Sequence, residues 1–338
     1  MLLVKFSRSC DQFANIKYLI CLLILLCFLI MPQTSVAESQ YANFSKIDMT
    51  LAIRGMNGIY LDNNVNKTNF SFLVMGHIYG SHDLRSPVWN PSYSGPAVTL
   101  LHELDRLSKL NADFIISLGD IVATVDNEET YMLENLFLKK FSIPVFNATG
   151  NHDSPLELYK KNYGETSFYF KYGNCMFIFL GYGRIPLDLF MEAVNLSKTD
   201  DEIKNIFVCK HTPEFLAISP KFIPIMKHAN AGFVYNDQTE FMLNCYPELE
   251  KISHEKGVYL LSGDIGANWS YSIFYHKEGN MHYIATGLGD TENDAILKFD
   301  CTEAGVRISP ISLIQGKEMH NIEYYGIDFW RMYFSFFR

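Results

Sequence analysis

The chain has 338 residues, of which 48% are hydrophobic and 19% are charged, and its formal net charge at pH 7 is −9. This acidic balance argues against nucleic acid as the main partner, because phosphate backbones require basic patches. The sequence contains no internal repeat, Pro/Ser-rich linker or low-complexity stretch, so its length predicts one large α/β domain or two small ones.

The N-terminal segment has the pattern of an export signal. Lys5, Arg8 and Lys17 precede an apolar run over 18–31, and small residues lead to Ala37. This order predicts a signal peptide over 1–37 that is cleaved after Ala37, and therefore a periplasmic or extracellular protein. An uncleaved N-terminal anchor in contact with a membrane is the alternative, because the basic region is long.

The rest of the chain divides into three segments. Residues 38–68 form a polar lead-in, residues 69–315 form the main domain, and residues 316–338 form an aromatic tail. We expect the tail to cover the core, with a membrane-interface or partner contact as the second interpretation. Export permits disulfides between Cys175, Cys209, Cys245 and Cys301, but Cys175 and Cys209 stand in strand-like runs, where buried thiols are expected.

Strands and helices alternate in the first half of the domain. The sequence predicts strands over 70–75, 114–118 and 143–146, and helices over 97–111 and 127–141. This rhythm is typical of βαβ units with a parallel sheet, whose ligands bind at the carboxyl ends of the strands. The long loop over 81–96 carries Trp89 and Tyr93, which could stack on a sugar or base.

The second half changes rhythm. Residues 168–170 and 175–180 flank a turn and predict a hairpin, and two further strands are expected over 206–209 and 258–261. Four segments then predict a meander of antiparallel strands, over 271–275, 282–286, 295–299 and 306–308. Together with the first half, these elements predict two mixed sheets covered by helices.

Five of the predicted strands end in residues that could bind a metal. These strand-end blocks are Gly76-His77 with Tyr79, Gly119-Asp120, Gly150-Asn151-His152-Asp153, Lys210-His211 and Gly263-Asp264. Strand ends of one sheet can direct their side chains to a single point, as a metal site requires. Imidazole and carboxylate groups suit Zn, Mn or Fe.

In the order of these blocks, residues 70–300 resemble the calcineurin-like metallophosphoesterase superfamily. The resemblance implies an α/β fold, a four-layer αββα sandwich of two mixed sheets flanked by helices, with two metals bound between the strand ends. It implies that Asp120 bridges both metals and that Asn151 and His211 hold the second. It also implies that His152 stands beside the scissile phosphate and that Asp153 orients His152.

The outermost blocks depart from the family pattern. His77 and Tyr79 stand where the family has Asp and His, and Asp264 and Gly266 stand where it has two histidines. The second metal keeps Asp120, Asn151, His211 and Asp264, whereas the first keeps Asp120, His77 and Tyr79 and loses one ligand. Four nearby residues could fill the gap: His82, Asp83, Asp290 and Glu292.

The resemblance implies hydrolysis of a phosphomonoester or phosphodiester by metal-activated water, with His152 protonating the leaving group. The substrate would be a small-molecule or glycan-linked phosphoester, and the cofactor one or two divalent or trivalent ions (Mn, Zn or Fe). The altered blocks favour a second hypothesis, a non-catalytic descendant that serves as a binding or assembly subunit. An unrelated hydrolase is a third hypothesis, but the sequence has no Gly-x-Ser-x-Gly nucleophile segment.

Overall fold

A computed structural model describes residues 53–62, 67–80, 95–226, 239–265 and 271–335, all of which belong to a compact unit formed by residues 49–338. Some expectations from the sequence lie outside the described residues, namely those for residues 1–37, His82, Asp83, Trp89, Tyr93 and Gly266.

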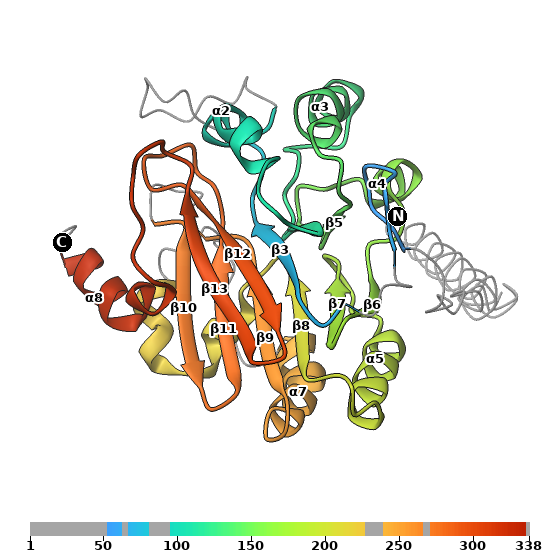
Figure 1. Cartoon of the computed structure of the whole chain (residues 1–338), viewed down its shortest axis with the longest axis vertical. Coiled ribbons are helices and arrows are strands. Elements are labelled where there is room, and N and C mark those ends of the chain that lie inside the picture. Colours follow the sequence, from blue (N-terminus) through green and yellow to red (C-terminus); the bar gives the residue numbers. More distant parts are fainter. Residues whose placement is uncertain (1–52, 63–66, 81–94, 227–238, 266–270, 336–338) are drawn as a thin grey trace, which may run out of the picture. The chain divides into compact units, whose positions relative to one another are not determined.

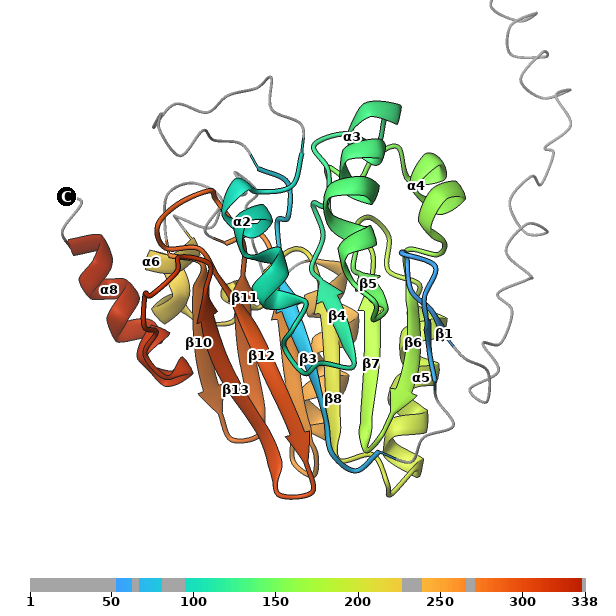
Figure 2. The same ribbon diagram turned by 45° about the horizontal axis from the view of Figure 1, so that its top comes forward.

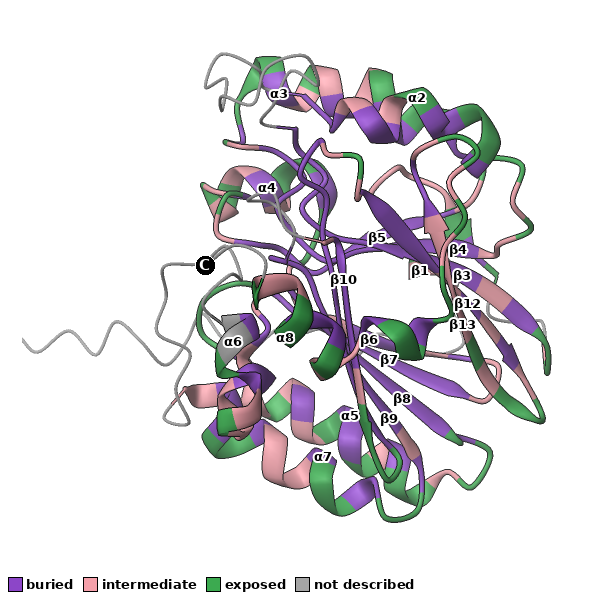
Figure 3. Cartoon of the chain, turned by 90° about the vertical axis from the view of Figure 1, so that its left-hand side faces the viewer, coloured by how far each residue is buried: buried purple, intermediate pink, exposed green. Residues whose placement is uncertain are grey.

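Two mixed sheets face each other, with helices on both outer sides (Figure 3). The five-stranded sheet has the order β13 (Gly305–Ser312), β12 (Ala295–Thr302), β3 (Phe70–Met75), β4 (Phe114–Ser117) and β5 (Val145–Asn147). The six-stranded sheet has the order β10 (Ile273–Glu278), β11 (Met281–Thr286), β9 (Gly257–Ser262), β8 (Asn205–Lys210), β7 (Cys175–Leu180) and β6 (Phe168–Tyr172). The predicted αββα sandwich is confirmed.

The helices form the two outer layers. Over the five-stranded sheet lie α2 (Val98–Leu107), α3 (Asn127–Met132) with the π-helical and 3₁₀ turns that continue it (Leu133–Phe137 and Leu138–Lys140), and α4 (Leu156–Tyr163). Over the six-stranded sheet lie α5 (Leu187–Thr199) and α7 (Tyr246–Ile252), the latter preceded by the π-helical turn η5 (Phe241–Cys245). Shorter helical elements are η3 (Glu214–Ile218), η4 (Pro220–Phe222), α6 (Ile223–Met226) and η6 (Ile322–Tyr325), and the last helix is α8 (Ile327–Ser335).

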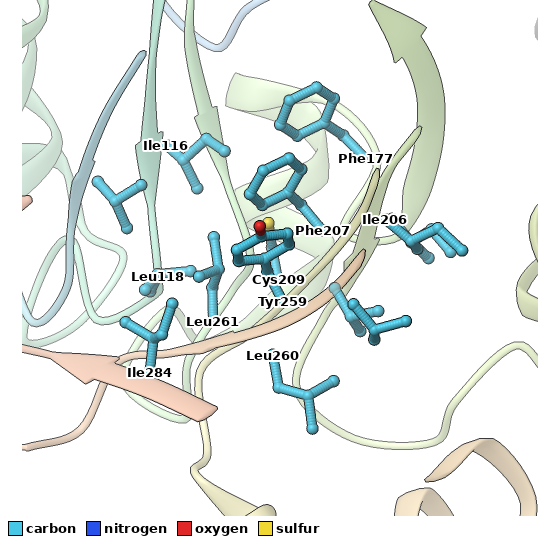
Figure 4. Close-up of a cluster of buried hydrophobic side chains, with 14 of the residues drawn as sticks. Ile116, Leu118, Phe177, Ile206, Phe207, Cys209, Tyr259, Leu260, Leu261 and Ile284 are labelled. Atoms are coloured by element: carbon cyan, nitrogen blue, oxygen red, sulfur yellow. The ribbon is translucent and has the colours of Figure 1, made fainter. Parts of the chain in front are cut away.

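Aromatic side chains fill the space between the sheets. The ring of Phe72 on β3 stacks on Phe114 and Phe299, with centroids 5.1 and 4.8 Å apart. Its edge contacts Phe207 of the opposite sheet at 5.2 Å, and Phe207 stacks on Phe177 (Figure 4). Because these strands are buried on both faces, they are apolar along their whole length instead of alternating. This packing sets the sheets face to face and brings their strand ends together.

The predicted meander is wrong. Strands β10 and β11 form one antiparallel hairpin in the six-stranded sheet, where β11 also pairs in parallel with β9. Strands β12 and β13 form a second hairpin in the other sheet, where β12 pairs antiparallel with β3. The chain crosses between the sheets after residue 286 (Figure 2), a step that strand periodicity cannot signal because both hairpins have the same local pattern.

Part of the lead-in segment is a hairpin that contacts the five-stranded sheet. A small hairpin of β1 (Ile53–Arg54) and β2 (Tyr60–Leu61) packs on β5, where Met56 N donates to the carbonyl of Val145 at 2.8 Å.

The four cysteines of the described residues are buried and free. No helix in the described ranges is long and apolar enough to cross a membrane.

Helix α8 packs against the edge strand β10. Trp330 is fully buried, and its Nε1 donates to the carbonyl of Ile273 at 3.1 Å. We expect Trp330→Phe to lower the free energy of unfolding by about 2 kcal/mol, because it leaves a void and a buried carbonyl without its donor. Chemical denaturation measures this. The control is Met332→Ala on the exposed side of α8, which should change stability by less than about 0.5 kcal/mol.

His282 on β11 makes the fold sensitive to acid. Burial, with a smaller contribution from Lys277, lowers the pKa of His282 from 6.5 to about 4; its ring stacks on Tyr259, and Nδ1 lies 3.1 Å from the hydroxyl of Tyr275. As pH falls, His282 is therefore protonated in the unfolded chain at a higher pH than in the folded protein. Stability supplied by neutral His282 is complete above about pH 6.5 and is lost progressively down to about pH 4.

We expect His282→Phe to reduce this acid-induced loss of unfolding free energy by roughly 3 kcal/mol between pH 7 and pH 4. Denaturation curves at several pH values measure the slope. The exposed His254, replaced by Gln, is the control and should leave the slope unchanged. An equal slope in the wild type and in His282→Phe would contradict the assignment.

Candidate functional site at the strand ends

The predicted site residues follow strands of both sheets. His77 follows β3, Asp120 follows β4, His211 follows β8 and Asp264 follows β9, while the block from Gly150 follows β5. Strands β3, β4 and β5 are parallel, as are β7, β8 and β9, and the arrowheads of β3, β7 and β8 point the same way in Figure 1. The strand ends of the two sheets therefore lie on one side of the domain.

One hydrogen bond joins the sheets at this point. Nδ1 of His211, which follows β8, lies 2.7 Å from the carbonyl of Leu118, which follows β4. Since a carbonyl only accepts, Nδ1 carries the proton of this bond, and Nε2 is the nitrogen that faces Asp120.

Backbone strain is concentrated at the same strand ends. The only non-glycine residues of the described ranges with positive φ are His77, Asp120, Asp264 and Asp290, at 49° to 54°. Such left-handed conformations are uncommon for residues with a side chain and cluster at functional sites. The sequence analysis names all four, three as metal ligands and Asp290 as a residue that could fill the ligand gap.

Glycines allow the strand ends to approach closely. A Cβ on Gly150 would lie 2.1 Å from Oδ1 of Asp120, and a Cβ on Gly119, whose φ is +84°, would lie 2.7 Å from Nδ1 of His211. Any side chain at either position would displace the carboxylate or the imidazole. This close approach explains why a glycine precedes the candidate ligands.

Two buried imidazoles converge on one carboxylate oxygen. Oδ2 of Asp120 lies 3.3 Å from Nε2 of His211 and 3.8 Å from Nε2 of His77. All three side chains are at most 3% exposed. Neither nitrogen of His77, nor Nε2 of His211, has a hydrogen-bond partner in the structure. Buried polar atoms without partners are rare and call for an explanation, of which a bound ion is one.

The electrostatics differ between the two imidazoles. Burial lowers the pKa of His77 to about 4, although Asp120 opposes this, so the ring is neutral and offers a lone pair. Burial also acts to lower the pKa of His211, but the nearby negative charge of Asp120, followed by that of Asp264, raises it to about 10. The pKa of Asp120 itself is held low, because burial is outweighed by His211 and His77.

The donors fit one metal ion. Two ligands bound to a tetrahedral metal at about 2.0–2.1 Å lie about 3.3–3.4 Å apart. The distance from Asp120 to His211 matches this value, and His77 is slightly farther away. Among the described residues, no group of three or more His, Cys, Asp or Glu side chains is already arranged around a metal position.

Tyr79 lies beside these donors. Its ring centroid is 4.3 Å from that of His77 and 5.2 Å from that of His152. Burial, followed by the charges of Asp120 and Asp264, raises the pKa of Tyr79 well above its usual range. Without a bound metal the phenol therefore keeps its proton and can donate a hydrogen bond. Gly263, which precedes Asp264, packs against the site, because a Cβ on it would lie 3.0 Å from Nδ1 of His211.

Other candidates lie differently. Asn151 is half-buried, and its carbonyl accepts a hydrogen bond from the hydroxyl of Ser154. Asp290, one of the residues that could fill the ligand gap, instead accepts from the amide of Thr99 in the first turn of α2. The amide nitrogen of Thr99 is one of those left unpaired within a helix, so Asp290 acts as a cap.

Asp153 does not hold His152, contrary to the expectation from the sequence. Its Oδ2 accepts from the backbone amides of Gly150 and Asp120, at 2.8 and 3.1 Å, and its Oδ1 accepts from that of Ile121 at 2.8 Å. The carboxylate lies completely buried beneath the loops, where it ties two strand ends together. Its remaining hydrogen bond comes from the side chain of Asn147, at 3.3 Å.

His152 is held by a backbone carbonyl. Its Nδ1 lies 3.0 Å from the carbonyl oxygen of Ala123, and its own amide donates to Oδ1 of Asp120 at 3.0 Å. Sequence reasoning missed Ala123, because any residue can supply a carbonyl. It also missed Glu129, whose Oε2 accepts from the amides of Ala123 and Thr124.

A surface cavity of about 290 Å³ contains none of these residues. It is lined by residues of η4, β10, η6 and α8 and by neighbouring positions, among them Lys221, His276 and Arg331.

Two facing mixed sheets with acidic and imidazole side chains at their shared strand ends define a metallophosphoesterase-type sandwich. The family model of the calcineurin-like phosphoesterases matches residues 70–225, which include β3 to β8 and end before β9 and Asp264. This part of the chain, residues 70–225, is similar to the calcineurin-like phosphoesterases. No curated protein matches the sequence.

Solved structures share the fold at low identity. A dimetal phosphatase from Danio rerio is 12% identical, with a TM-score of 0.51 over 72% of this chain and 96% of its own. A purple acid phosphatase from yellow lupin seeds is 10% identical, with a TM-score of 0.50 over 76% of this chain and 53% of its own. GAP50, described as the anchor in the inner membrane complex of Plasmodium, is 13% identical, with a TM-score of 0.49 over 76% of this chain and 89% of its own.

Proposed function

We propose that the protein is an exported metal-dependent phosphoesterase that works with one metal ion. The observation that carries this proposal is the convergence of two buried, unpartnered imidazole nitrogens on one oxygen of Asp120. The proposed ligands are His77, Asp120 and His211. A divalent ion held there would neutralise the charge of a phosphoester and acidify an attacking water.

The remaining residues have distinct roles. Because Nδ1–H of His152 donates to Ala123, Nε2 is the nitrogen that can give a proton to the leaving oxygen. The protonated hydroxyl of Tyr79 can donate a hydrogen bond to a phosphate oxygen, since its ring lies between those of His77 and His152. Asp153 fixes the backbone that carries Asp120 and Gly150. The substrate would be a small-molecule or glycan-linked phosphoester.

Purified protein tests this function directly. We expect about one equivalent of Mn, Zn or Fe by elemental analysis, and hydrolysis of 4-nitrophenyl phosphate or bis(4-nitrophenyl) phosphate. Chelation should abolish turnover, and re-addition of the metal should restore it. Protein that contains no metal, and that stays inactive after each of the three ions is added, would sink the proposal.

A second function is favoured by the charge balance of the site. The pair of Asp120 and His211 is neutral overall without a metal, because each keeps the other charged. The fold could therefore serve as a metal-free binding or assembly subunit. In that case a chelator would leave the melting temperature unchanged, whereas removal of a bound metal from the proposed enzyme should lower it by several degrees.

A further inference from the structure

The loop over 121–125 lies between β4 and α3 and has no regular secondary structure. Its backbone amides are held from several directions: Ile121 N by Asp153, Ala123 N and Thr124 N by Glu129, and Val125 N by the carbonyl of Ser154. The position of the Ala123 carbonyl therefore depends on side chains outside the loop.

The hydrogen bonds of the Glu129 side chain differ from those of a usual capping box. It is three residues after Asp126, which caps α3 by accepting from the amide of Glu129 at 2.8 Å. In the usual capping box, a glutamate at this position returns to the amide of the cap residue itself. Here Oε2 of Glu129 reaches further back, to Ala123 N at 2.6 Å and Thr124 N at 2.9 Å.

These contacts form a continuous chain to His152. Glu129 holds the amides of Ala123 and Thr124, and the carbonyl of Ala123 accepts from Nδ1 of His152 at 3.0 Å. The same carbonyl also accepts from the hydroxyl of Thr124 at 2.8 Å. Glu129 is buried, whereas His152 is exposed.

We propose that Glu129 is a positioning residue that holds the 121–125 loop so that its carbonyl fixes His152 as the Nδ1–H tautomer. Nε2 is then the nitrogen that exchanges a proton with the substrate. This role replaces the one expected of Asp153, and it rests on the phosphoesterase function proposed above. The amides of Ala123 and Thr124 both donate to Oε2 of Glu129. The loop therefore requires one acceptor oxygen at this position.

The prediction is tested on the full-length chain by replacing Glu129. Glu129→Ala removes the acceptor oxygen. Glu129→Asp shortens the side chain by one methylene, so that the oxygen no longer reaches the two amides, whereas Glu129→Gln keeps one acceptor oxygen in place. The control is Glu128→Ala, which removes the same charge from the same turn of α3 at an exposed position. Histidine-selective ¹⁵N labelling reports the tautomer at about pH 8, where an ordinary imidazole is neutral, and the His152→Asn spectrum assigns the signal.

We expect the wild type, Glu129→Gln and Glu128→Ala to show His152 as the Nδ1–H tautomer. Glu129→Ala and Glu129→Asp should show a mixture of tautomers. With 4-nitrophenyl phosphate, kcat should fall about tenfold or more in these two variants, with KM little changed, because proton transfer contributes to the chemical step.

The spectrum decides the proposal even if the protein does not hydrolyse phosphoesters. An unchanged His152 signal in Glu129→Ala or Glu129→Asp would overturn it. So would Glu129→Gln behaving as Glu129→Ala does, because the acceptor oxygen would then not be the relevant feature. If the wild-type protein shows no hydrolysis while Glu129→Ala still changes the tautomer of His152, that result would support the positioning role of Glu129 and contradict only the proposed phosphoesterase function.

Discussion

Replacing Asp120 by asparagine is expected to abolish metal binding and to lower the rate of phosphoester hydrolysis by about a thousandfold or more. The carboxylate is the one anionic group shared by His77 and His211, at 3.8 and 3.3 Å. Asparagine keeps the shape and can still accept from the amide of His152, so the fold should survive. Elemental analysis and steady-state kinetics measure the two effects.

The matched control is Asp105→Asn on the exposed face of α2, which removes one charge without touching the site. It should retain both metal and activity. An Asp120→Asn variant that retained its metal content and its kcat/KM would show that the strand-end carboxylate is not a ligand. The proposed one-metal site would then be wrong.

Asp153→Ala is expected to have the largest effect on stability, about 4 kcal/mol of unfolding free energy. The fully buried carboxylate accepts from the amides of Gly150, Asp120 and Ile121 and from the side chain of Asn147. Removing it leaves these donors buried without a partner, and each such donor costs about 1–3 kcal/mol before the structure relaxes. Chemical denaturation measures the loss.

Asp126→Ala gives the scale for this measurement. Asp126 is exposed and caps α3 through one hydrogen bond, so its removal should cost about 1 kcal/mol. Asp153→Asn should fall between the two, because one oxygen is kept for Ile121 while the amide group faces donors. A loss in Asp153→Ala no greater than that in Asp126→Ala would contradict the role given to Asp153.

The sequence was informative where local pattern and chemistry coincide. Apolar runs predicted the strands, because a strand buried on both faces must be apolar along its length. The residues that follow those runs, such as Asp120 and His211, could be placed together because parallel strands end at one edge. The close approach of Gly150 to Asp120 agrees with the glycine-first pattern of the blocks.

Other features carried no such signal. The crossing between β11 and β12 depends on which sheet edge is free, and both hairpins have the same periodicity. The carbonyl of Ala123 that holds His152 belongs to the backbone, which every residue has. Glu129 stands three residues after the N-cap residue Asp126, which is the spacing of an ordinary capping box. Its hydrogen bonds to the amides of Ala123 and Thr124 could therefore not be predicted from its position.

By itself, the sequence predicted the resemblance to the calcineurin-like phosphoesterases, the two-sheet sandwich and the strand ends where the polar groups meet, because apolar strands and the polar residues that follow them are local features of the chain. Only the tertiary structure decided the duties of those groups. It showed Asp153 bound to the backbone amides of two strand ends, and it placed the ring of Tyr79 against those of His77 and His152. The physical reason is that hydrogen bonds and pKa values depend on distances between segments far apart in the chain.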